Sequence, residues 1–400
     1  MTRDESASRR KPGQRASSAR SLRDTLTAYA YLSPSALIVG VFGIFPLFFT
    51  IYVSLFKWRL ARGDFAGLDN YVKLLGGNLW YLAATLASVG GIVLAAFLLG
   101  RRRGRWGPLL LSVGVMVLTG SLLGLGLSLP SLASQGDKEA FDALRVTIWY
   151  SVCTVPVQLA AGLVLALLLT RRMRGRQAFR VIYLIPYIAP TVATAAIFEL
   201  LFSLRPDSFA NQLIKLLGAA PLQWLQESRG IVQLALGAGL QWASASVVPL
   251  YWAGWAQGPS LALASIVIYS WWVFVGYYAL IYINGLGAIP RQLYEAAEVD
   301  GAGRVRSFFS ITIPLLSPTT YFLSLLGVIG TFKAFTQLYV LRSAAASGTV
   351  DAVSVFIFFT AFRKGNMGYA SAISILLFLI VLGLTVLQQR TTEKSVNYGD

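Results

Sequence analysis

The sequence predicts an all-α, polytopic membrane protein with about eight transmembrane helices. Three observations point to this fold class. Hydrophobic residues make up 56% of the chain and charged residues only 13%, whereas about a quarter of a soluble domain is charged. Several apolar stretches reach the roughly 20 residues that a helix needs to cross a bilayer. Basic residues gather between these stretches, as in loops that are held on the cytoplasmic side of a membrane.

The N-terminal segment, residues 1–27, is rich in Ser and Arg and is expected to be a disordered cytoplasmic tail. Residues 28–56 form the first predicted span, which Pro34 and Pro46 are expected to start and kink. The first span and the polar loop that follows it occupy residues 28–80. The basic tail places the start of the span inside the cell.

Two further spans are predicted over residues 81–100 and 107–130. Between them, four of the five residues at 101–105 are arginine, so this loop is expected on the cytoplasmic side. The two spans form a transmembrane hairpin, residues 81–130, which leaves the orientation of the following chain unchanged.

The fourth and fifth spans are predicted over residues 144–170 and 179–203, with a second arginine-rich loop, residues 171–176, between them. Pro186 and Pro190 fall four residues apart near the start of the fifth span. Such a pair breaks regular helix, and lipid tolerates the break only beside other helices or a cavity.

The stretch over residues 204–260 is expected outside the membrane. Its middle, residues 231–257, is moderately apolar and contains Trp242, Trp252 and Trp255. An additional span here would place the next loop outside the cell, so an interfacial or protein-packed segment is the preferred interpretation.

The last three spans are predicted over residues 261–284, 315–341 and 369–387. A packed segment on the outer side, residues 351–362, is expected between the last two. Residues 391–400 form a predicted cytoplasmic tail.

A polar loop, residues 285–313, separates the sixth and seventh spans and is rich in helix-forming residues. Pro290 stands where a first helical turn tolerates proline, and Gly301 stands where a helix ends, so they bracket a helix of about ten residues. A second short helix is expected over residues 304–309, stopped by Pro314. One face of the first helix, at i, i+3 and i+4 spacing, carries an apolar set that lets another backbone come close: Leu293, Ala296 and Ala297.

The residue content excludes several classes of protein. The chain contains no histidine, which excludes Ser-His-Asp and Cys-His catalysis and His-ligated metal sites. Cys153 is the single cysteine, so no intrachain disulfide can form. No G-x-x-x-x-G-K-[ST] pattern occurs, so the chain does not carry its own P-loop. The net charge of +17 is interpreted as loop topology rather than nucleic-acid binding.

The loop at residues 285–313 also carries a motif: Glu-Ala-Ala, three residues, Gly, nine residues, Ile, one residue and Leu-Pro, with Ile313 in place of the leucine. This pattern resembles the signature loop of inner-membrane subunits of binding-protein-dependent ABC importers. Residues 65–71, 185–190 and 365–372 resemble three further segments of the same family, and residues 185–190 are similar to its maltose-type members.

The resemblance implies the type I ABC importer permease fold, with residues 131–390 as its core and residues 81–130 as an inserted hairpin. It also implies that the loop at residues 285–313 holds a coupling helix, which docks into a cleft on a separate ATPase subunit. The coupling residues are then those of the motif and its neighbours: Glu295, Ala296, Ala297, Asp300, Gly301, Arg304, Ile311 and Pro314.

The similarity to the carbohydrate-uptake branch, the maltose and glycerol-3-phosphate type, implies a transport subunit rather than an enzyme. Its expected partners are a second homologous permease, a dimer of ATPase subunits, an extracytoplasmic solute-binding protein, a sugar substrate and membrane lipid, but no nucleic acid. No cofactor is expected on this chain, because ATP and magnesium bind to the partner ATPase. The expected location is the cytoplasmic membrane of a bacterium or archaeon.

A substrate path is expected where the sixth and seventh spans meet. Sugars offer hydroxyl groups to hydrogen bonds and C–H faces to aromatic rings. The two spans leave the loop in opposite directions, so positions about equally far from it can meet near mid-membrane. For each aromatic side chain alone, helix packing or a membrane-interface role is the alternative. The candidates are Ser270, Tyr277, Gly330, Thr331 and Gln337.

Three other functions remain open: an ABC permease for another solute such as a polyol or a phosphodiester, a secondary transporter, and a membrane-embedded enzyme. An ion-coupled carrier is expected to hold ionisable groups within its spans. Among the acidic residues, only Glu199 lies inside a predicted span, near its outer end, where a solvated carboxylate is the preferred interpretation. Lys333 is the one cation inside the seventh span, and it either snorkels or faces a hydrated cavity. The scarcity of buried acids disfavours the secondary transporter, and the enzyme is disfavoured by the absence of histidine and of paired intramembrane carboxylates.

Overall fold

The computed structural model describes residues 14–59, 61–100, 107–170, 175–218, 220–236 and 250–392. Within these residues the regular secondary structure is helical, apart from two isolated β-bridges. The predicted all-α fold class is therefore confirmed. The chain divides into two compact units, Met1–Val53 and Ser54–Asp400, which are described in turn.

The first unit is a long helical segment. α1 (Gln14–Val39) continues through a π-helical turn, η1 (Gly40–Ile44), into α2 (Phe45–Ser54). The expected disordered tail is thus wrong from Gln14 onward, because the Arg, Ala and Leu residues of this segment are good helix formers. Residues 1–13 of that tail lie outside the described residues. The stretch Thr27–Ser54 is long and apolar enough to cross a membrane.

The two prolines of the first span occupy different places. Pro34 lies inside α1 rather than at the start of the span, and Pro46 lies in the first turn of α2, directly after η1. A π-helical turn shifts the backbone hydrogen-bond ladder by one residue, and such adjustments re-satisfy groups that a proline leaves free in a membrane helix. The irregularity that the prolines predict is therefore found at η1 and Pro46.

The second unit contains the predicted hairpin, formed by α4 (Leu79–Gly100) and α5 (Gly107–Gln135), which pack along their lengths. α5 runs through Pro130 to Gln135 and is longer than predicted. The arginine-rich loop at residues 101–105 lies outside the described residues.

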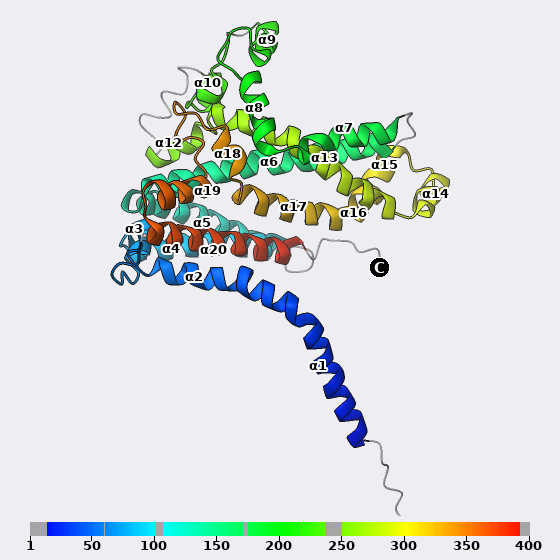
Figure 1. Ribbon diagram of the computed structural model, residues 1–400. Coiled ribbons are helices and arrows are strands. Elements are labelled where there is room, and N and C mark those ends of the chain that lie inside the picture. The colour runs from blue at the N-terminus through cyan, green and yellow to red at the C-terminus, as the bar shows by residue number, and fades with distance from the viewer. Residues whose placement is uncertain are drawn as a thin grey trace, which may run out of the picture. The chain divides into compact units, whose positions relative to one another are not determined.

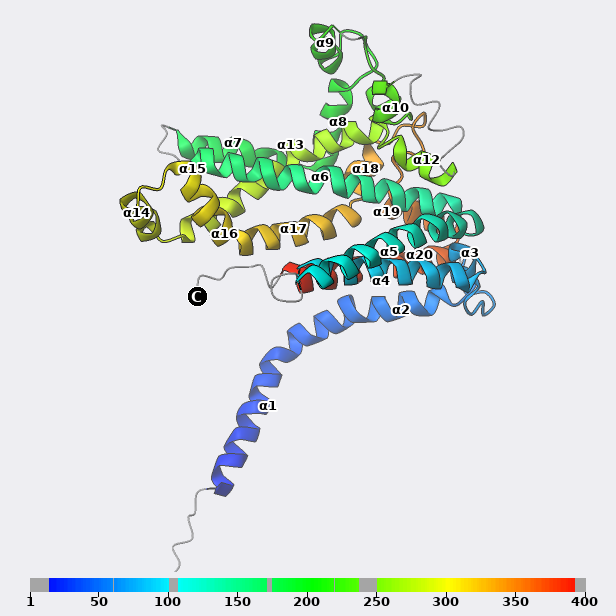
Figure 2. The same cartoon turned by 180° about the vertical axis from the view of Figure 1, so that it is seen from behind.

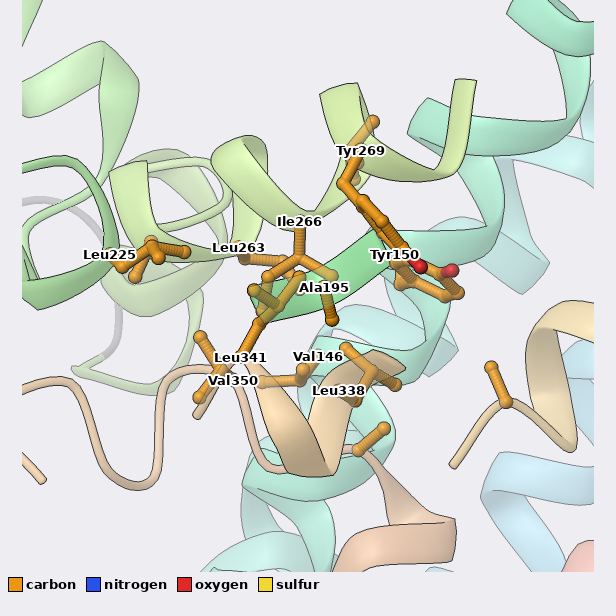
Figure 3. Packing of buried hydrophobic residues seen from close by; sticks show 14 of the residues in the cluster. Val146, Tyr150, Ala195, Leu225, Leu263, Ile266, Tyr269, Leu338, Leu341 and Val350 are labelled. Atoms are coloured by element: carbon orange, nitrogen blue, oxygen red, sulfur yellow. The ribbon is translucent and has the colours of Figure 1, made fainter. Parts of the chain in front are cut away.

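Four long helices occupy the centre of the second unit: α6 (Lys138–Thr170), α13 (Leu261–Ala288), α17 (Ser317–Phe332) and α20 (Met367–Thr392). α6 packs against both α13 and α17 (Figure 1). Figure 3 shows the buried core beside them, where Val146 of α6, Ile266 of α13 and Leu338 of α18 (Thr336–Val340) converge.

The predicted fifth span is not a single straight helix. α7 (Arg176–Ile188) and α8 (Thr191–Leu201) meet at an angle of 95°. Pro190 causes the break, because it holds Ala189 in an extended conformation and cannot continue the hydrogen-bond ladder. The break that the proline pair predicts is confirmed, and α7 and α8 together can count as one broken span.

The predicted seventh span, residues 315–341, agrees with the apolar span Ser317–Val340, but the helix is irregular before it and inside it. α15 (Arg304–Ser307), a π-helical turn η4 (Phe308–Thr312) and α16 (Ile313–Leu315) lead directly into α17, so Pro314 does not stop the helix. Pro314 falls within the first two residues of α16, where its missing N–H is tolerated. At the other end α17 stops at Phe332, and the exposed Lys333 lies at the break before α18.

The remaining described helices are short and connect or cover the bundle. They are α3 (Asp69–Leu75), α9 (Phe209–Leu216), η2 (Trp224–Gln226), α10 (Ile231–Leu236), α12 (Leu250–Ala256), α14 (Arg291–Val299), α19 (Val353–Phe358) and η5 (Phe359–Arg363). In the Trp-rich stretch, Trp252 donates its indole N–H to the Gly126 carbonyl of α5 at 2.9 Å, as a protein-packed segment requires. Trp242 lies outside the described residues.

The number of spans agrees with the sequence. Among the described residues, six helices are long and apolar enough to cross a membrane, and up to eight if each of two bent helix pairs counts as one span. The two bent pairs are α3 with α4, and α7 with α8.

The helix ends in the second unit follow the predicted alternation. In both views the carboxyl ends of α4, α6, α13 and α20 lie toward the end of the bundle that carries α14 and α15 (Figures 1 and 2). The starts of α5 and α7 lie toward that same end. The described residues next to both arginine-rich loops are therefore on the same side as the polar loop, although residues 101–105 and 171–174 themselves lie outside the described residues.

The close packing of α13 on α7 depends on Gly276. A Cβ at this position would lie 1.8 Å from the Tyr183 carbonyl oxygen, whereas a Cβ at Gly287 on the same helix would meet nothing within 4 Å. We expect Gly276→Val to destabilise the protein by about 1–3 kcal/mol, because α7 must move away. Gly287→Val is the matched control and should leave the thermal melting of the detergent-purified protein near that of the wild type. Equal melting temperatures for the two variants would contradict this packing.

Candidate functional site

The polar loop contains the predicted helix, now seen as α14 (Arg291–Val299). Pro290 precedes its first residue, and Gly301 follows it with φ +73, in the left-handed region that favours glycine. Gly301 N–H donates to the Glu298 carbonyl at 3.0 Å and Ala302 N–H donates to the Ala297 carbonyl at 2.8 Å. These two bonds form a Schellman motif, which satisfies the last carbonyls of the helix and turns the chain sharply.

The outer surface of this loop exposes both large apolar side chains and charged side chains. None of the residues of α14 is buried. Val299 is 88% exposed, and Val305 and Phe309 on the following helical segment are 72% and 64% exposed. Exposed clusters of large apolar side chains rimmed by charged residues, here Glu295 and Arg304, mark protein–protein interaction sites. The arrangement can therefore receive a partner protein at this end of the bundle.

The predicted apolar face of α14 is only partly turned outward. Leu293 and Ala296 are exposed, whereas Ala297 is half-buried. The inner side of α14 is fixed by Tyr294, whose hydroxyl is hydrogen bonded to Thr312 Oγ1 at 2.9 Å. Ile311 packs on the same buried cluster as Tyr294, and Pro314 begins the helix that leads from it into α17.

A buried polar network joins α6 to α13 and α18, at the other candidate site. The Tyr150 hydroxyl of α6 is hydrogen bonded to Ser270 Oγ of α13 at 2.7 Å, and Gln337 Nε2 of α18 donates to the same Tyr150 oxygen at 3.1 Å. Gln158 Nε2 donates to the Ser270 carbonyl at 3.0 Å. Ser151, which follows Tyr150 on α6, accepts a hydrogen bond of 2.9 Å from Thr331 Oγ1.

Three of the five predicted path residues thus bond to neighbouring residues of α6. Ser270 and Gln337 share Tyr150, and Thr331 bonds to the adjacent Ser151. Ser270 and Thr331 are buried, so their hydroxyl groups serve contacts within the chain.

The other two predicted path residues make different contacts. The Tyr277 ring stacks on Tyr187 of α7, with ring centroids 4.5 Å apart and planes 17° from parallel. Gly330 is exposed, and an added Cβ would meet nothing within 4 Å. Ser270, Thr331 and Gln337 are thus joined to α6 by hydrogen bonds, whereas Tyr277 contacts α7 and Gly330 leaves open space.

Sequence reasoning missed the contribution of α6, although the sequence carries a signal for it. Thr147, Ser151, Thr154 and Gln158 follow i, i+4, i+7 and i+11 spacing and so form one polar stripe on an apolar helix. All four side chains are buried. A buried polar stripe in a membrane helix indicates contact with other helices or with a polar cavity.

The opposite end of the bundle has two open cavities that share Arg342. One cavity, of about 640 Å³, is lined by Glu199, Arg205 and Gln226, and the other, of about 390 Å³, by Asp142 and Asp351 among others. Arg342 Nε lies 2.6 Å from Asp351 Oδ1, and this carboxylate raises the pKa of the Arg342 guanidinium. Glu199 is exposed and lines the first cavity.

Comparison with known proteins assigns the family. Residues 158–393 match the family described as the binding-protein-dependent transport system inner membrane component. The probable ABC transporter permease protein YurN of Bacillus subtilis is 25% identical over 373 residues, which cover 92% of this chain and 96% of YurN. The trehalose/maltose transport system permease protein MalF of Thermococcus litoralis is 32% identical over 249 residues, covering 62% of this chain and 73% of MalF.

Two further comparisons extend this result. The sn-glycerol-3-phosphate transport system permease protein UgpA of Rhizobium meliloti is 30% identical over 267 residues, covering 66% of this chain and 79% of UgpA. A chain in the crystal structure of a bacterial alginate ABC transporter, in complex with a periplasmic protein bound to alginate pentasaccharide, superposes with a TM-score of 0.61. That likeness has 15% identity, covers 95% of this chain and 99% of the other, and shows the fold alone. This chain is a multi-pass membrane protein that belongs to the family of binding-protein-dependent transport system inner membrane components.

Proposed function

We propose that this chain is the transmembrane permease subunit of an ATP-driven carbohydrate importer. The observation that carries the proposal is the exposed apolar and charged surface of α14 and α15, in a chain whose family works with external binding proteins. The relatives from T. litoralis and R. meliloti are permeases for trehalose/maltose and for sn-glycerol-3-phosphate, which supports a sugar or a close derivative as the substrate.

The surface of α14 and α15 couples this chain to a separate ATPase, which binds ATP and magnesium and hydrolyses the nucleotide. Val299, Val305 and Phe309 supply the apolar contact area, because they are the large apolar side chains most exposed on this loop. Glu295 is an exposed carboxylate and pairs with a basic group of the ATPase. The proposed coupling residues are Glu295, Ala296, Ala297, Asp300, Gly301, Arg304, Ile311 and Pro314.

The complete importer contains a second homologous permease, two ATPase subunits and an extracytoplasmic solute-binding protein. Closure of the ATPases on ATP moves the coupling helices and turns the path outward, and the binding protein then releases its sugar into that path. ATP and the loaded binding protein must both bind the outward-facing state more tightly, because a ligand shifts a conformational equilibrium only by its difference in affinity.

The substrate path runs beside α13, α17 and α18. Gln337 is half-buried and offers an amide to sugar hydroxyls, while Tyr277 offers a ring face and a hydroxyl. Gly330 leaves open space for a pyranose ring. Ser270 and Thr331 do not contact the sugar themselves. Their hydrogen bonds to α6 hold α13 and α17 in place beside the path.

A phosphorylated polyol is a second candidate substrate. Lys333 is an exposed cation at the break between α17 and α18, three residues after Gly330, and a cation there attracts a phosphate group. The relative UgpA supports this alternative. Competition between labelled maltose and unlabelled glycerol-3-phosphate for uptake separates the two substrates.

Uptake by proteoliposomes that contain the complete importer tests the proposed function. Labelled maltose should accumulate only with ATP inside the vesicles and with the binding protein outside. Accumulation in ATP-free vesicles under an imposed proton gradient would instead indicate a secondary transporter.

The side of the membrane on which α14 lies can be checked separately. We expect a cysteine at position 297, in a Cys153→Ser background, to resist a membrane-impermeant thiol reagent added to intact cells, because the loop faces the cytoplasm. The same cysteine should react after the cells are opened and the ATPase is removed, since Ala297 is half-buried within this chain rather than enclosed. Labelling in intact cells would contradict the cytoplasmic position of the loop.

A further inference from the structure

Tyrosine hydroxyl groups connect α13 to α17, and α14 to the helical segment that leads into α17. The three tyrosines lie on the first side of the loop, and their partners lie on the returning side in reverse order, as in an antiparallel hairpin. The bonds are Tyr294 to Thr312 Oγ1 at 2.9 Å, Tyr282 to Thr320 Oγ1 at 3.2 Å, and Tyr278 to the Leu323 carbonyl at 3.5 Å.

The helices around these bonds are in close contact. Tyr278 and Tyr282 are 4% and 1% exposed. A Cβ added at Gly285 would lie 2.6 Å from Thr319 Oγ1, and one added at Gly327 would lie 2.5 Å from the Tyr278 hydroxyl. There is no space in which α13 and α17 could slide past one another without breaking these contacts.

The Tyr294 bond differs from the other two because it holds the exposed helix α14. Tyr294 also packs in a cluster with Ile289 at the end of α13 and with Ile311 and Leu316 near the start of α17. Its partner Thr312 is the last residue of the π-helical turn η4, where the backbone ladder is irregular. A side-chain bond at this residue therefore fixes α14 at a point where the backbone alone is easily deformed.

We infer that Tyr294 is a positioning residue, which fixes α14 to the helical segment that leads into α17, so that a displacement of α14 moves α13 and α17 together. Tyr282 and Tyr278 continue this connection toward the middle of both helices. The displacement of α13 and α17 then reaches Ser270 on α13 and Gln337 beyond α17. Both residues are hydrogen bonded to the Tyr150 hydroxyl. The inference rests on the proposed function, because it requires α14 to be the contact with the ATPase.

The test uses the complete importer in proteoliposomes, with maltose-loaded binding protein, and measures maltose transported per ATP hydrolysed. Tyr294→Phe keeps the ring and loses the hydrogen bond, and Thr312→Val removes the partner hydroxyl. Each should lower transport per ATP by about threefold, the factor that corresponds to the ~0.6 kcal/mol of an average interhelical hydrogen bond in a membrane protein. The double variant should be no worse than either single one, because both remove the same bond.

Two controls separate positioning from general stability. Tyr71→Phe removes a tyrosine hydroxyl bond of 2.7 Å to Ser54, away from the loop, and should leave transport per ATP unchanged. Thr312→Ser keeps a hydroxyl group and should restore coupling relative to Thr312→Val. A purely structural role would instead lower the melting temperature and leave transport per ATP unchanged in the complexes that remain intact.

The outcomes also separate this inference from the proposed function. Wild-type transport per ATP in both Tyr294→Phe and Thr312→Val, together with a loss in Gly301→Val, would overturn the positioning role and leave the docking role of the loop standing. Full activity of Gly301→Val as well would overturn the docking role itself. Where Tyr294→Phe fails to assemble, the comparison of Thr312→Val with Thr312→Ser decides the question.

Discussion

Gly301→Val should abolish sugar-stimulated ATP hydrolysis and transport while leaving the membrane helices assembled. Gly301 has φ +73. A left-handed conformation raises the free energy of an ordinary residue by ~1–2 kcal/mol, and that of a β-branched residue by at least as much. We expect the backbone at position 301 to leave the left-handed region, which breaks the two hydrogen bonds at the end of α14. α14 then no longer presents Glu295 and Val299 to the ATPase in one fixed orientation.

Gly303→Val is the matched control for this variant. Gly303 has φ −68, which any residue adopts, and both glycines have nothing within 4 Å of an added Cβ. The two variants therefore add the same side chain to the same loop and differ in backbone strain. We expect Gly303→Val to keep most of the sugar-stimulated ATPase activity, and neither variant should affect sugar binding by the external protein. If the purified Gly301→Val complex keeps full stimulated activity and transport, this loop is not the coupling element.

The loop helix could be predicted from sequence because its signals are local. Pro290 and Gly301 each restrict the backbone at their own position, so the bounds of α14 follow from single residues. Pro314 shows the limit of such reasoning. Proline stops a helix when it falls in the interior, but η4 resets the ladder just before it, so Pro314 lies in a first turn and the helix continues.

The arrangement of the path residues could not be predicted in the same way, because it depends on contacts between distant segments. Equal distance from the loop placed Tyr277 and Thr331 at similar depths, but depth does not say which way a side chain points. Ser270 is turned to Tyr150 of α6, whereas Gly330, the neighbour of Thr331, faces away from the chain. The bend of 95° at Pro190 also brings Tyr187 against Tyr277, a contact that no local pattern indicates.

Gly330→Trp should abolish maltose uptake while leaving assembly and basal ATP hydrolysis intact. Gly330 is exposed on α17, and an added Cβ meets nothing within 4 Å, so the chain itself accepts a larger side chain without repacking. An indole ring in the proposed path fills the space that a sugar ring needs. Tyr277→Ala should also stop uptake, because it removes the ring that stacks on Tyr187 and faces the substrate in our proposal.

The interpretation of Gly330→Trp depends on a second tryptophan variant at an equally open position. Gly383 lies on α20 and also has nothing within 4 Å of an added Cβ, so Gly383→Trp adds the same side chain to a membrane helix outside the proposed path. Uptake should survive Gly383→Trp and fail in Gly330→Trp at equal amounts of assembled importer. Normal uptake by a well-assembled Gly330→Trp importer would mean that the sugar passes elsewhere, because an indole ring cannot share a narrow path with a pyranose.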